Sequence, residues 1–300
     1  MGTIIERVDV AHGGWRSRHS ALRLAVNAAT TCLDRAGRSP NDLDLLVNAG
    51  IYRDRNLGEP ALAAMIQEDI GAHPEDPHTD AHGTFSFDVA NGTCGVLTGL
   101  QIVDGFLRSR TIRYALVVAS DADPGHGMSE DFPFSATGGA VLCSWTDRRY
   151  GLGRVHWTNA DDDLGGAFRA TVGHLDDRNV LRVDQSEWMD ARYAAAAAAA
   201  VTACLKHASL QLGDIDRIAA APARPQFRAE LAQRLELPES RITIAADHRM
   251  HTAALVAGLD GGDHHAPAGT RTLIVAAGAG VTAGAALYEE PPAPGTPAPS

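Results

Sequence analysis

Apolar residues follow two patterns along the chain, one typical of helices and one typical of buried strands. Apolar spacings of three or four predict helices over residues 60–70, 96–107, 190–208, 227–235 and 252–259. Short continuous apolar runs predict strands at 85–89, 114–120, 134–145, 217–221, 241–245 and 272–276. Because strands and helices alternate, the pattern favours parallel sheets covered by helices on both faces, which is an α/β fold.

One stretch of this pattern occurs twice. Residues 25–46 and 197–218 align without a gap, and each copy predicts an amphipathic helix, a short polar loop and the start of a strand. The identical pairs include Thr30/Thr202, Cys32/Cys204, Leu33/Leu205, Ala36/Ala208, Asp42/Asp214 and Asp44/Asp216. The repeat predicts two duplicated βαβαβ halves, residues 1–150 and 151–290, with a site between them. Residues 291–300 are Pro-rich, and we expect a disordered tail.

Composition narrows the class of protein. The 300 residues are 45% hydrophobic, which is enough for one large core shared by two lobes. Apolar runs fall short of the roughly 20 residues of a membrane span, and residues 1–14 lack the order of a secretory signal. We therefore expect a cytoplasmic protein with no membrane partner. A formal charge of −11 with 5% aromatic residues argues against nucleic acid as a partner.

Two turns between a predicted strand and a predicted helix carry residues with reactive side chains. Cys94 lies in the Gly-rich turn 90–95, where a helix start would lower the thiol pKa and favour a nucleophile, although a buried packing residue fits this spacing equally well. His251 lies in the equivalent turn of the second half, as a base, a hydrogen-bond donor or a structural residue. Duplicated halves related by a pseudo-twofold axis would bring these two turns face to face.

Three weaker signals lie nearby. His248 and His251, with His264 and His265, could be read as a zinc site, but ligand spacing is missing and we expect no metal. The glycine loop 278–284 could present backbone N–H groups to an oxyanion, or could be only a tight turn. Arginines such as Arg224 could receive an acidic carrier or a nucleotide phosphate, although a solvated helix end explains such residues more often.

With these segments in order, the chain resembles the thiolase superfamily, specifically its ketoacyl-ACP synthase III branch. Residues 87–121 (FDVANGTCGVLTGLQIVDGFLRSRTIRYALVVASD) are similar to the family's nucleophile segment without a gap. Further similar segments are PALAAMIQEDIGA (60–72), FSATGGAVLC (134–143) and LIVAAGAGVTAGAAL (273–287). The resemblance covers about residues 20–288 and implies the thiolase-like αβαβα layered sandwich of two duplicated halves.

The catalytic positions depart from the family's pattern. In the ungapped alignment Thr93 takes the place of the family's cysteine and Cys94 follows it. Ala221 stands in the place of the family's histidine, and His251 in the place of its asparagine. The N-terminus is also shorter than the family's. One of the two side-chain donors that stabilise an enolate is thus absent, so acyl transfer is easier to account for than condensation.

The resemblance implies an acyltransferase or condensing enzyme of fatty-acid, polyketide or other secondary metabolism. Its expected catalytic residues are Cys94, Thr93, His251 and the backbone N–H of Ala279. Its expected substrate- or carrier-binding residues are Arg224, Arg249, Gly278 and Gly280. The acyl group would come from acyl-CoA or acyl carrier protein, with no other cofactor, in a homodimer or in a heterodimer with a related synthase. The alternative is a catalytically degenerate subunit that serves as the structural partner of an active ketosynthase.

Overall fold

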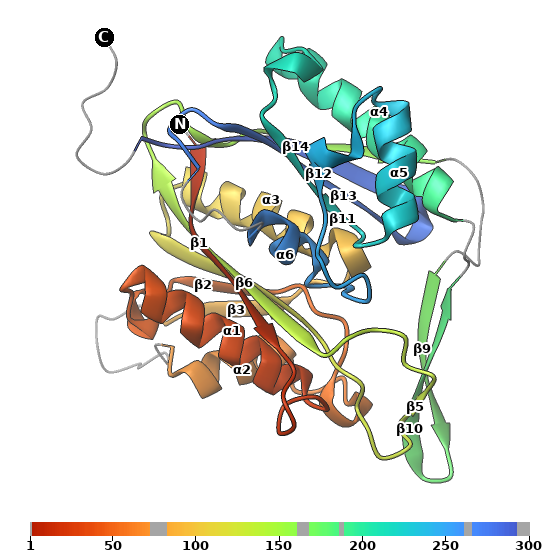
Figure 1. Cartoon of the computed structure of the whole chain (residues 1–300). Helices are drawn as coiled ribbons and strands as arrows, with labels where there is room; N and C mark the ends of the chain where they lie inside the picture. Colours follow the sequence, from red (N-terminus) through yellow and green to blue (C-terminus); the bar gives the residue numbers. More distant parts are fainter. Residues whose placement is uncertain (1, 73–82, 161–167, 186–188, 261–265, 293–300) are drawn as a thin grey trace.

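The computed structural model describes residues 2–72, 83–160, 168–185, 189–260 and 266–292. Layers of helices alternate with two half-sheets. In Figure 1 one layer of helices covers each outer face, and another lies between the half-sheets. This is the α/β layered arrangement that the sequence predicts. The Pro-rich tail predicted at 291–300 lies, beyond residue 292, outside the described residues.

The strand order of the two half-sheets reveals the duplication. The first half-sheet has the order β3-β2-β4-β6-β1, with bounds β1 (Gly2–His12), β2 (Leu45–Asn48), β3 (Phe85–Asp88), β4 (Tyr114–Asp121) and β6 (Thr137–Thr146). The second has the order β12-β11-β13-β14-β8, with bounds β8 (His156–Asn159), β11 (Arg217–Ala221), β12 (Ile242–Thr243), β13 (Arg271–Gly278) and β14 (Thr282–Glu289). The strands correspond one to one, so the repeat seen in the sequence extends through both halves.

The prediction of wholly parallel sheets is wrong for part of each half. β3, β2 and β4 run parallel, but β6 runs antiparallel to both β4 and β1. In the second half β14 is likewise antiparallel to β13 and β8. The reason is that β13 continues into β14 through a short loop with no crossover helix, and such a connection reverses the chain. The short strand β7 (Gly151–Leu152) pairs with both β1 and β14 and joins the half-sheets.

Helices cover the half-sheets on both faces. The outer layers are α1 (Ala21–Ala36) with α2 (Leu62–Ile70), and α4 (Asp190–Ala208) with α5 (Pro225–Arg234). The middle layer is α3 (Gly95–Arg108) with α6 (Ala254–Asp260). Local sequence sets the ends of α1: Ser20 caps it by accepting from the Arg23 N–H, and Gly37 ends it with a left-handed φ of 65°.

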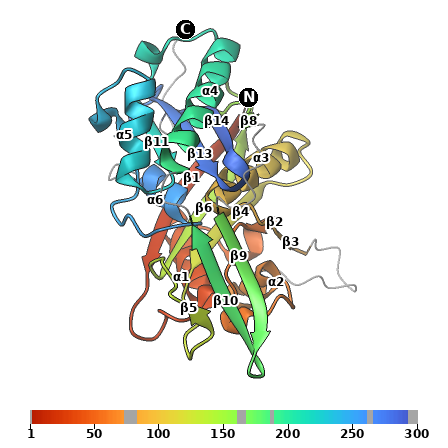
Figure 2. The same ribbon diagram turned by 90° about the vertical axis from the view of Figure 1, so that its right-hand side faces the viewer.

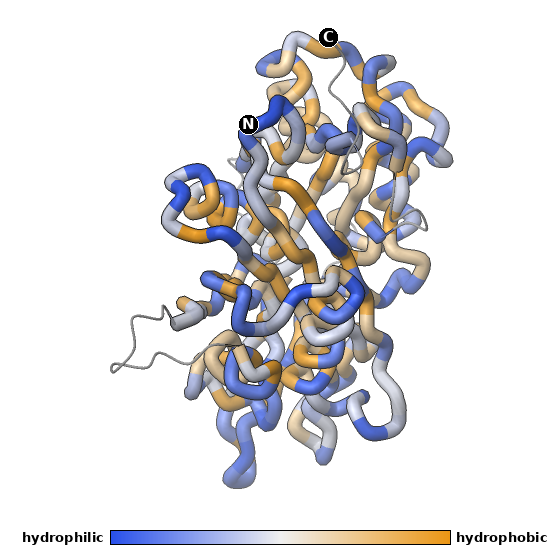
Figure 3. The backbone as a smooth tube through the Cα atoms, turned by 90° about the vertical axis from the view of Figure 1, so that its left-hand side faces the viewer, coloured by the Kyte–Doolittle hydropathy of each residue, from blue (hydrophilic) through white to orange (hydrophobic). Residues whose placement is uncertain are grey.

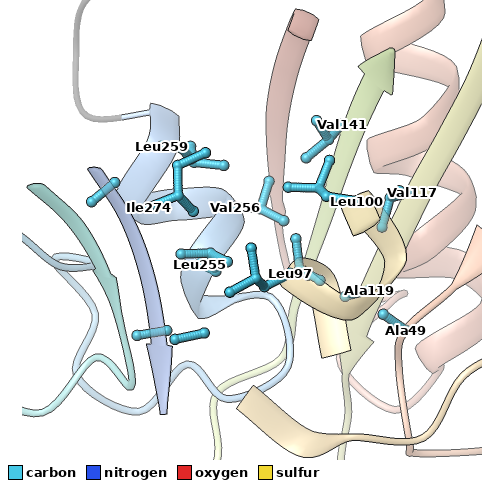
Figure 4. Close-up of a cluster of buried hydrophobic side chains, with 14 of the residues drawn as sticks. Ala49, Leu97, Leu100, Val117, Ala119, Val141, Leu255, Val256, Leu259 and Ile274 are labelled. Carbon is cyan, nitrogen blue, oxygen red and sulfur yellow. The ribbon is translucent and has the colours of Figure 1, made fainter. Parts of the chain in front are cut away.

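The middle layer holds the largest part of the core. Figure 4 shows Leu97 and Leu100 of α3 facing Leu255 and Val256 of α6 between the two half-sheets. The helix α3 lies close to its sheet because residue 99 is glycine, where a Cβ would stand 2.8 Å from a Val117 methyl group. Hydrophobic residues gather inside and hydrophilic ones on the outer loops in Figure 3. The two strand-to-helix turns that carry Cys94 and His251 both lead into this middle layer.

A small separate sheet was not anticipated from the sequence. It consists of the hairpin β9 (Phe168–Leu175) and β10 (Arg178–Gln185), with β5 (Ser129–Glu130) parallel to β10. Figures 1 and 2 show it at one side of the layered body. Asp176 and Asp177 both have positive φ at the hairpin turn, and this acidic pair between two strand-like runs was the available signal.

Candidate active site

The two turns meet at one cavity of about 320 Å³. Gly92 and Thr93 come from the first half, and Met250, His251 and Gly278 come from the second. The hairpin adds Phe168 and Gln185, while Phe134, Tyr193, Arg224, His248 and Arg249 complete much of the remaining lining. The structure therefore brings together residues that lie far apart along the chain, at the junction between the halves.

Cys94 belongs to the first turn, but its thiol faces away from the cavity. The side chain is fully buried, does not line the cavity, and its Sγ donates to the Thr282 carbonyl at 3.6 Å. Burial raises the pKa of this thiol to about 12. The expectation of a lowered pKa at the helix start is therefore wrong, because desolvation of a thiolate here outweighs the favourable field of α3.

Thr93 is the residue of this turn that lines the cavity. Its Oγ1 donates a short hydrogen bond of 2.5 Å to the Ala277 carbonyl at the end of β13. The side chain is 5% exposed, so the hydroxyl lies at the cavity wall with its proton directed to the backbone of the other half. Its oxygen lone pairs remain available to a molecule in the cavity.

Asp121 holds the second turn. This buried carboxylate ends β4 and accepts the N–H groups of His251 and Thr252, each at 2.9 Å. It also accepts the Thr252 hydroxyl at 2.6 Å. These donors precede α6, so a carboxylate from the first half satisfies the start of a helix in the second. The His251 backbone is thereby fixed against the end of β4 in the first half.

The His251 imidazole lies among aromatic rings. Phe134 stacks on it with centroids 4.2 Å apart, and Phe168 lies 4.9 Å away. Its Nδ1 is 2.9 Å from the hydroxyl of Tyr52. Burial lowers the pKa of His251 to about 4, and the charge of Asp121 only partly offsets this effect. The imidazole is therefore neutral at neutral pH.

The glycine loop follows β13 and adjoins the Thr93 turn. Gly278 has extended backbone, and its lack of a side chain matters because a Cβ would stand 2.6 Å from Thr93 Oγ1. Ala279 begins the turn η7 (Ala279–Val281), where Gly280 has a left-handed φ of 70°. Gly278 lines the cavity, whereas the oxyanion role of the Ala279 N–H stays a prediction.

Arg224 and Arg249 bring positive charge to the cavity wall. The Arg224 guanidinium pairs with the buried Asp190 at 3.0 Å, and burial raises the pKa of that carboxyl group. The Arg249 Nε donates to the Pro133 carbonyl at 2.9 Å. An acidic or phosphorylated part of a ligand would meet these two cations at the cavity.

Neither a metal centre nor a membrane-spanning helix is found in the described part of the chain. Over the described ranges, His, Cys, Asp and Glu side chains form no group of three or more suited to a metal ion. His264 and His265 lie outside these ranges, so of the four histidines this finding covers only His248 and His251. The helices in the described part of the chain are all too short or too polar to cross a membrane.

Three residues of the site were not predicted from the sequence. Tyr52 follows β2, Asp121 ends β4, and Phe168 begins the hairpin. Asp121 had a usable signal, since a carboxylate at the carboxyl end of a predicted buried strand commonly faces the site of an α/β protein. Tyr52 and Phe168 carried no such signal, because only the fold brings their rings to His251.

Known proteins share this architecture. A β-ketoacyl-[acyl-carrier-protein] synthase III of Sphingopyxis alaskensis is 28% identical over 95% of the chain and 92% of its own length. The synthase III structure of Aquifex aeolicus VF5 superposes with a TM-score of 0.79 at 17% identity, covering 96% of this chain and 100% of that one. The priming β-ketosynthase of the R1128 polyketide pathway gives 0.76 at 20% identity, covering 97% of both chains. No family model matches the chain.

The chain has the thiolase-like fold of the β-ketoacyl-[acyl-carrier-protein] synthase III structures, and its sequence is similar to that of such a synthase over 95% of its length. This bears out the resemblance and the fold expected over residues 20–288. Relative to the family's pattern, Thr93 in the cysteine place and His251 in the asparagine place both line the cavity, whereas Ala221 in the histidine place is buried at the end of β11. The positions at which the chain differs from the pattern that it resembles therefore lie at and beside this cavity.

Proposed function

We propose that the protein is an acyl-thioester-dependent acyltransferase or condensing enzyme of the synthase III type. The observation that carries the proposal is that Thr93 of the first half and His251 of the second line one cavity. The names of the relatives, which are synthases acting with an acyl carrier protein and a polyketide priming ketosynthase, support the same class. The degenerate-subunit alternative is not needed to account for these findings.

In the proposed reaction the thioester carbonyl enters between Thr93 and His251. Attack by Thr93 Oγ1 on the carbonyl carbon forms an ester and breaks the carbon–sulfur bond, and the hydroxyl proton leaves with the departing thiol. The neutral imidazole of His251 donates a hydrogen bond to the carbonyl oxygen as negative charge develops on it. A protonated acceptor nucleophile then attacks the ester carbonyl carbon and takes the acyl group, the bond from that carbon to Thr93 Oγ1 breaks, and the acceptor's proton restores the Thr93 hydroxyl.

The cavity lining suggests how the substrate lies. Phe134, Phe168 and Tyr193 offer apolar surface to the acyl chain. Arg224 and Arg249 would face the phosphate-bearing part of coenzyme A or of a carrier protein's prosthetic arm. Measuring acyl loading from the same acyl group on coenzyme A and on acyl carrier protein would identify the donor.

Intact-mass measurement after incubation with short-chain acyl-CoA tests the covalent step. We expect an acyl adduct on the wild type and on Cys94→Ala, because the Cys94 thiol is turned away from the cavity. The adduct should disappear in Thr93→Ala. An adduct lost only in Cys94→Ala would return the nucleophile to that thiol. A folded wild type without any adduct or turnover would contradict the proposal and favour a structural subunit.

The proposed assembly is a homodimer or a heterodimer with a related synthase. Light scattering on the pure protein distinguishes them. Twice the chain mass together with turnover of acyl-CoA supports the homodimer. A monomer that turns over only after addition of a related synthase supports the heterodimer.

A further inference from the structure

Tyr52 is a buried residue of the first half that contacts the imidazole of the second. It lies in the loop after β2, is 2% exposed, and its hydroxyl is 2.9 Å from His251 Nδ1 although the two residues are 199 positions apart in sequence. The mechanism described above gives Tyr52 no role. Its ring is itself held by Phe132, in an edge-to-face contact with centroids 4.9 Å apart.

The contact with Tyr52 determines which nitrogen of His251 is free. Because Nδ1 is occupied by the tyrosine hydroxyl, Nε2 is the nitrogen that remains for a ligand. A Cβ placed on Gly92, which lines the cavity, would stand 3.8 Å from Nε2. Nε2 therefore points to the turn that carries Thr93.

The donor of this hydrogen bond follows from the hydrogen-bonding needs of the Tyr52 hydroxyl and the His251 imidazole. Among the described residues, the Tyr52 hydroxyl makes its hydrogen bond to Nδ1 alone. If Nδ1 carried the proton and donated it, the tyrosine O–H would be left buried without an acceptor, at a cost of about 1–3 kcal/mol. If the tyrosine donates, both groups are satisfied and the imidazole proton resides on Nε2.

We propose that Tyr52 is a positioning residue that fixes His251 as the Nε2–H tautomer, so that His251 acts as a hydrogen-bond donor to the substrate carbonyl and not as a general base. The proposal deepens the function proposed above and rests on it for its catalytic part. It gives His251 the same chemistry that an asparagine amide would supply in this place, namely one N–H donor directed into the cavity. The lowered pKa of His251 agrees with it, because a neutral ring has one donor and one acceptor.

The tautomer is read directly by nitrogen NMR of the protein labelled with ¹⁵N-histidine. The His251 signals are assigned as those missing from His251→Asn. We expect the wild type to show a protonated Nε2 and an unprotonated Nδ1 between pH 6 and 8, and Tyr52→Phe to show a mixture of tautomers. Tyr52→Phe keeps the ring against Phe132 and removes only the hydroxyl. A protonated Nδ1 in the wild type, or an unchanged spectrum in Tyr52→Phe, overturns the proposal.

The kinetic arm uses a double-mutant cycle on acyl transfer. We expect Tyr52→Phe to lower kcat roughly 10- to 100-fold with little change in KM, since it disturbs a donor through its orienting partner. In the His251→Asn background the same change should have no effect on kcat, because an amide needs no tautomer. An equal loss in both backgrounds would assign Tyr52 a merely structural role. The NMR arm requires no turnover, so failure of the proposed function would leave the tautomer assignment separately decided.

Discussion

Thr93 and Cys94 differ in what their side chains contact although they are neighbours in one turn. The Thr93 hydroxyl lies at the cavity wall, while the Cys94 thiol donates to the Thr282 carbonyl behind it. Successive residues at the start of a helix point about 100° apart. A cavity on one side of the turn therefore receives one of them, and the other packs into the middle layer.

A thiol placed at residue 93 should therefore react faster than the natural hydroxyl. We expect Thr93→Cys to form the acyl adduct more rapidly than the wild type, because a thiol ionises far more readily than an alcohol and is intrinsically more nucleophilic. The rate of adduct formation from acyl-CoA, followed by intact mass, measures this. Thr93→Ser is the matched control, since it keeps a hydroxyl and should stay near the wild-type rate. A slower reaction in Thr93→Cys would argue against residue 93 as the attacking position.

The buried imidazole of His251 should make stability depend on pH. Its pKa is lowered to about 4 in the folded protein and is about 6.5 in an unfolded chain. Above pH 6.5 the residue is neutral in both states; as pH falls towards 4, the unfolded state binds a proton that the folded state refuses. We expect the wild type to lose about 3 kcal/mol of unfolding free energy over this range relative to His251→Asn.

Urea unfolding at a series of pH values measures that difference. His174→Asn is the control, because its side chain is two-thirds exposed on the hairpin and should leave the pH profile close to that of the wild type. If the unfolding free energies of the wild type and His251→Asn changed with pH in the same way, burial would not lower the pKa of this imidazole in the folded protein.

The sequence was sufficient to predict part of this site. The twin positions of the two turns pointed to residue 93 or 94 opposite His251, since duplicated elements place equivalent turns around one axis. It did not decide between Thr93 and Cys94, because that depends on which side of the turn faces the cavity. Tyr52 was out of reach as well, since its partner lies in the other half.

At the scale of elements, the end of β4 is tied to the start of α6 by Asp121. Asp121→Asn should lower the unfolding free energy by about 3 kcal/mol, because one amide oxygen cannot accept every donor there and its NH₂ group faces N–H groups. It should also weaken acyl loading by releasing the His251 turn. Asp147→Asn is the control, since its pair with Arg110 is exposed. Urea unfolding of both variants gives the comparison, and equal effects would contradict the capping role.

The close approach of β13 to the Thr93 turn depends on residue 278 having no side chain. In Gly278→Ala the added Cβ would stand 2.6 Å from Thr93 Oγ1 and 3.3 Å from Cys94 Sγ. We expect a loss of about 1–3 kcal/mol in unfolding free energy and a strong loss of acyl adduct, because residue 93 must move. Gly213→Ala is the matched control, since a Cβ there meets nothing within 4 Å. Full acyl loading in Gly278→Ala would show that the turn tolerates displacement.

At the scale of the whole molecule, the sequence predicted the two duplicated halves. It did not predict the small sheet around the hairpin β9–β10, which is not duplicated. The matched helices at 25–36 and 197–208 pointed to two halves, and the identical strand order bears this out. The hairpin β9–β10 has no counterpart in the first half, so the repeat could not indicate it. Its exposed, mostly polar strands also lack the apolar runs that mark a buried sheet.

This hairpin nevertheless completes the cavity, through Phe168 on one face of His251. We expect Phe168→Ala to raise the pKa of His251 towards its ordinary value, because water reaches the imidazole once the ring is removed. It should also raise KM for acyl-CoA several-fold through the loss of apolar lining. Val172→Ala is the matched control on the same strand, since that side chain is 51% exposed and does not line the cavity. The pH titration of the ¹⁵N-histidine signals measures the first effect and steady-state kinetics the second. An unchanged pKa in Phe168→Ala would mean that the layered body buries the imidazole without the hairpin, and that the hairpin contributes to the substrate pocket without controlling the charge of His251.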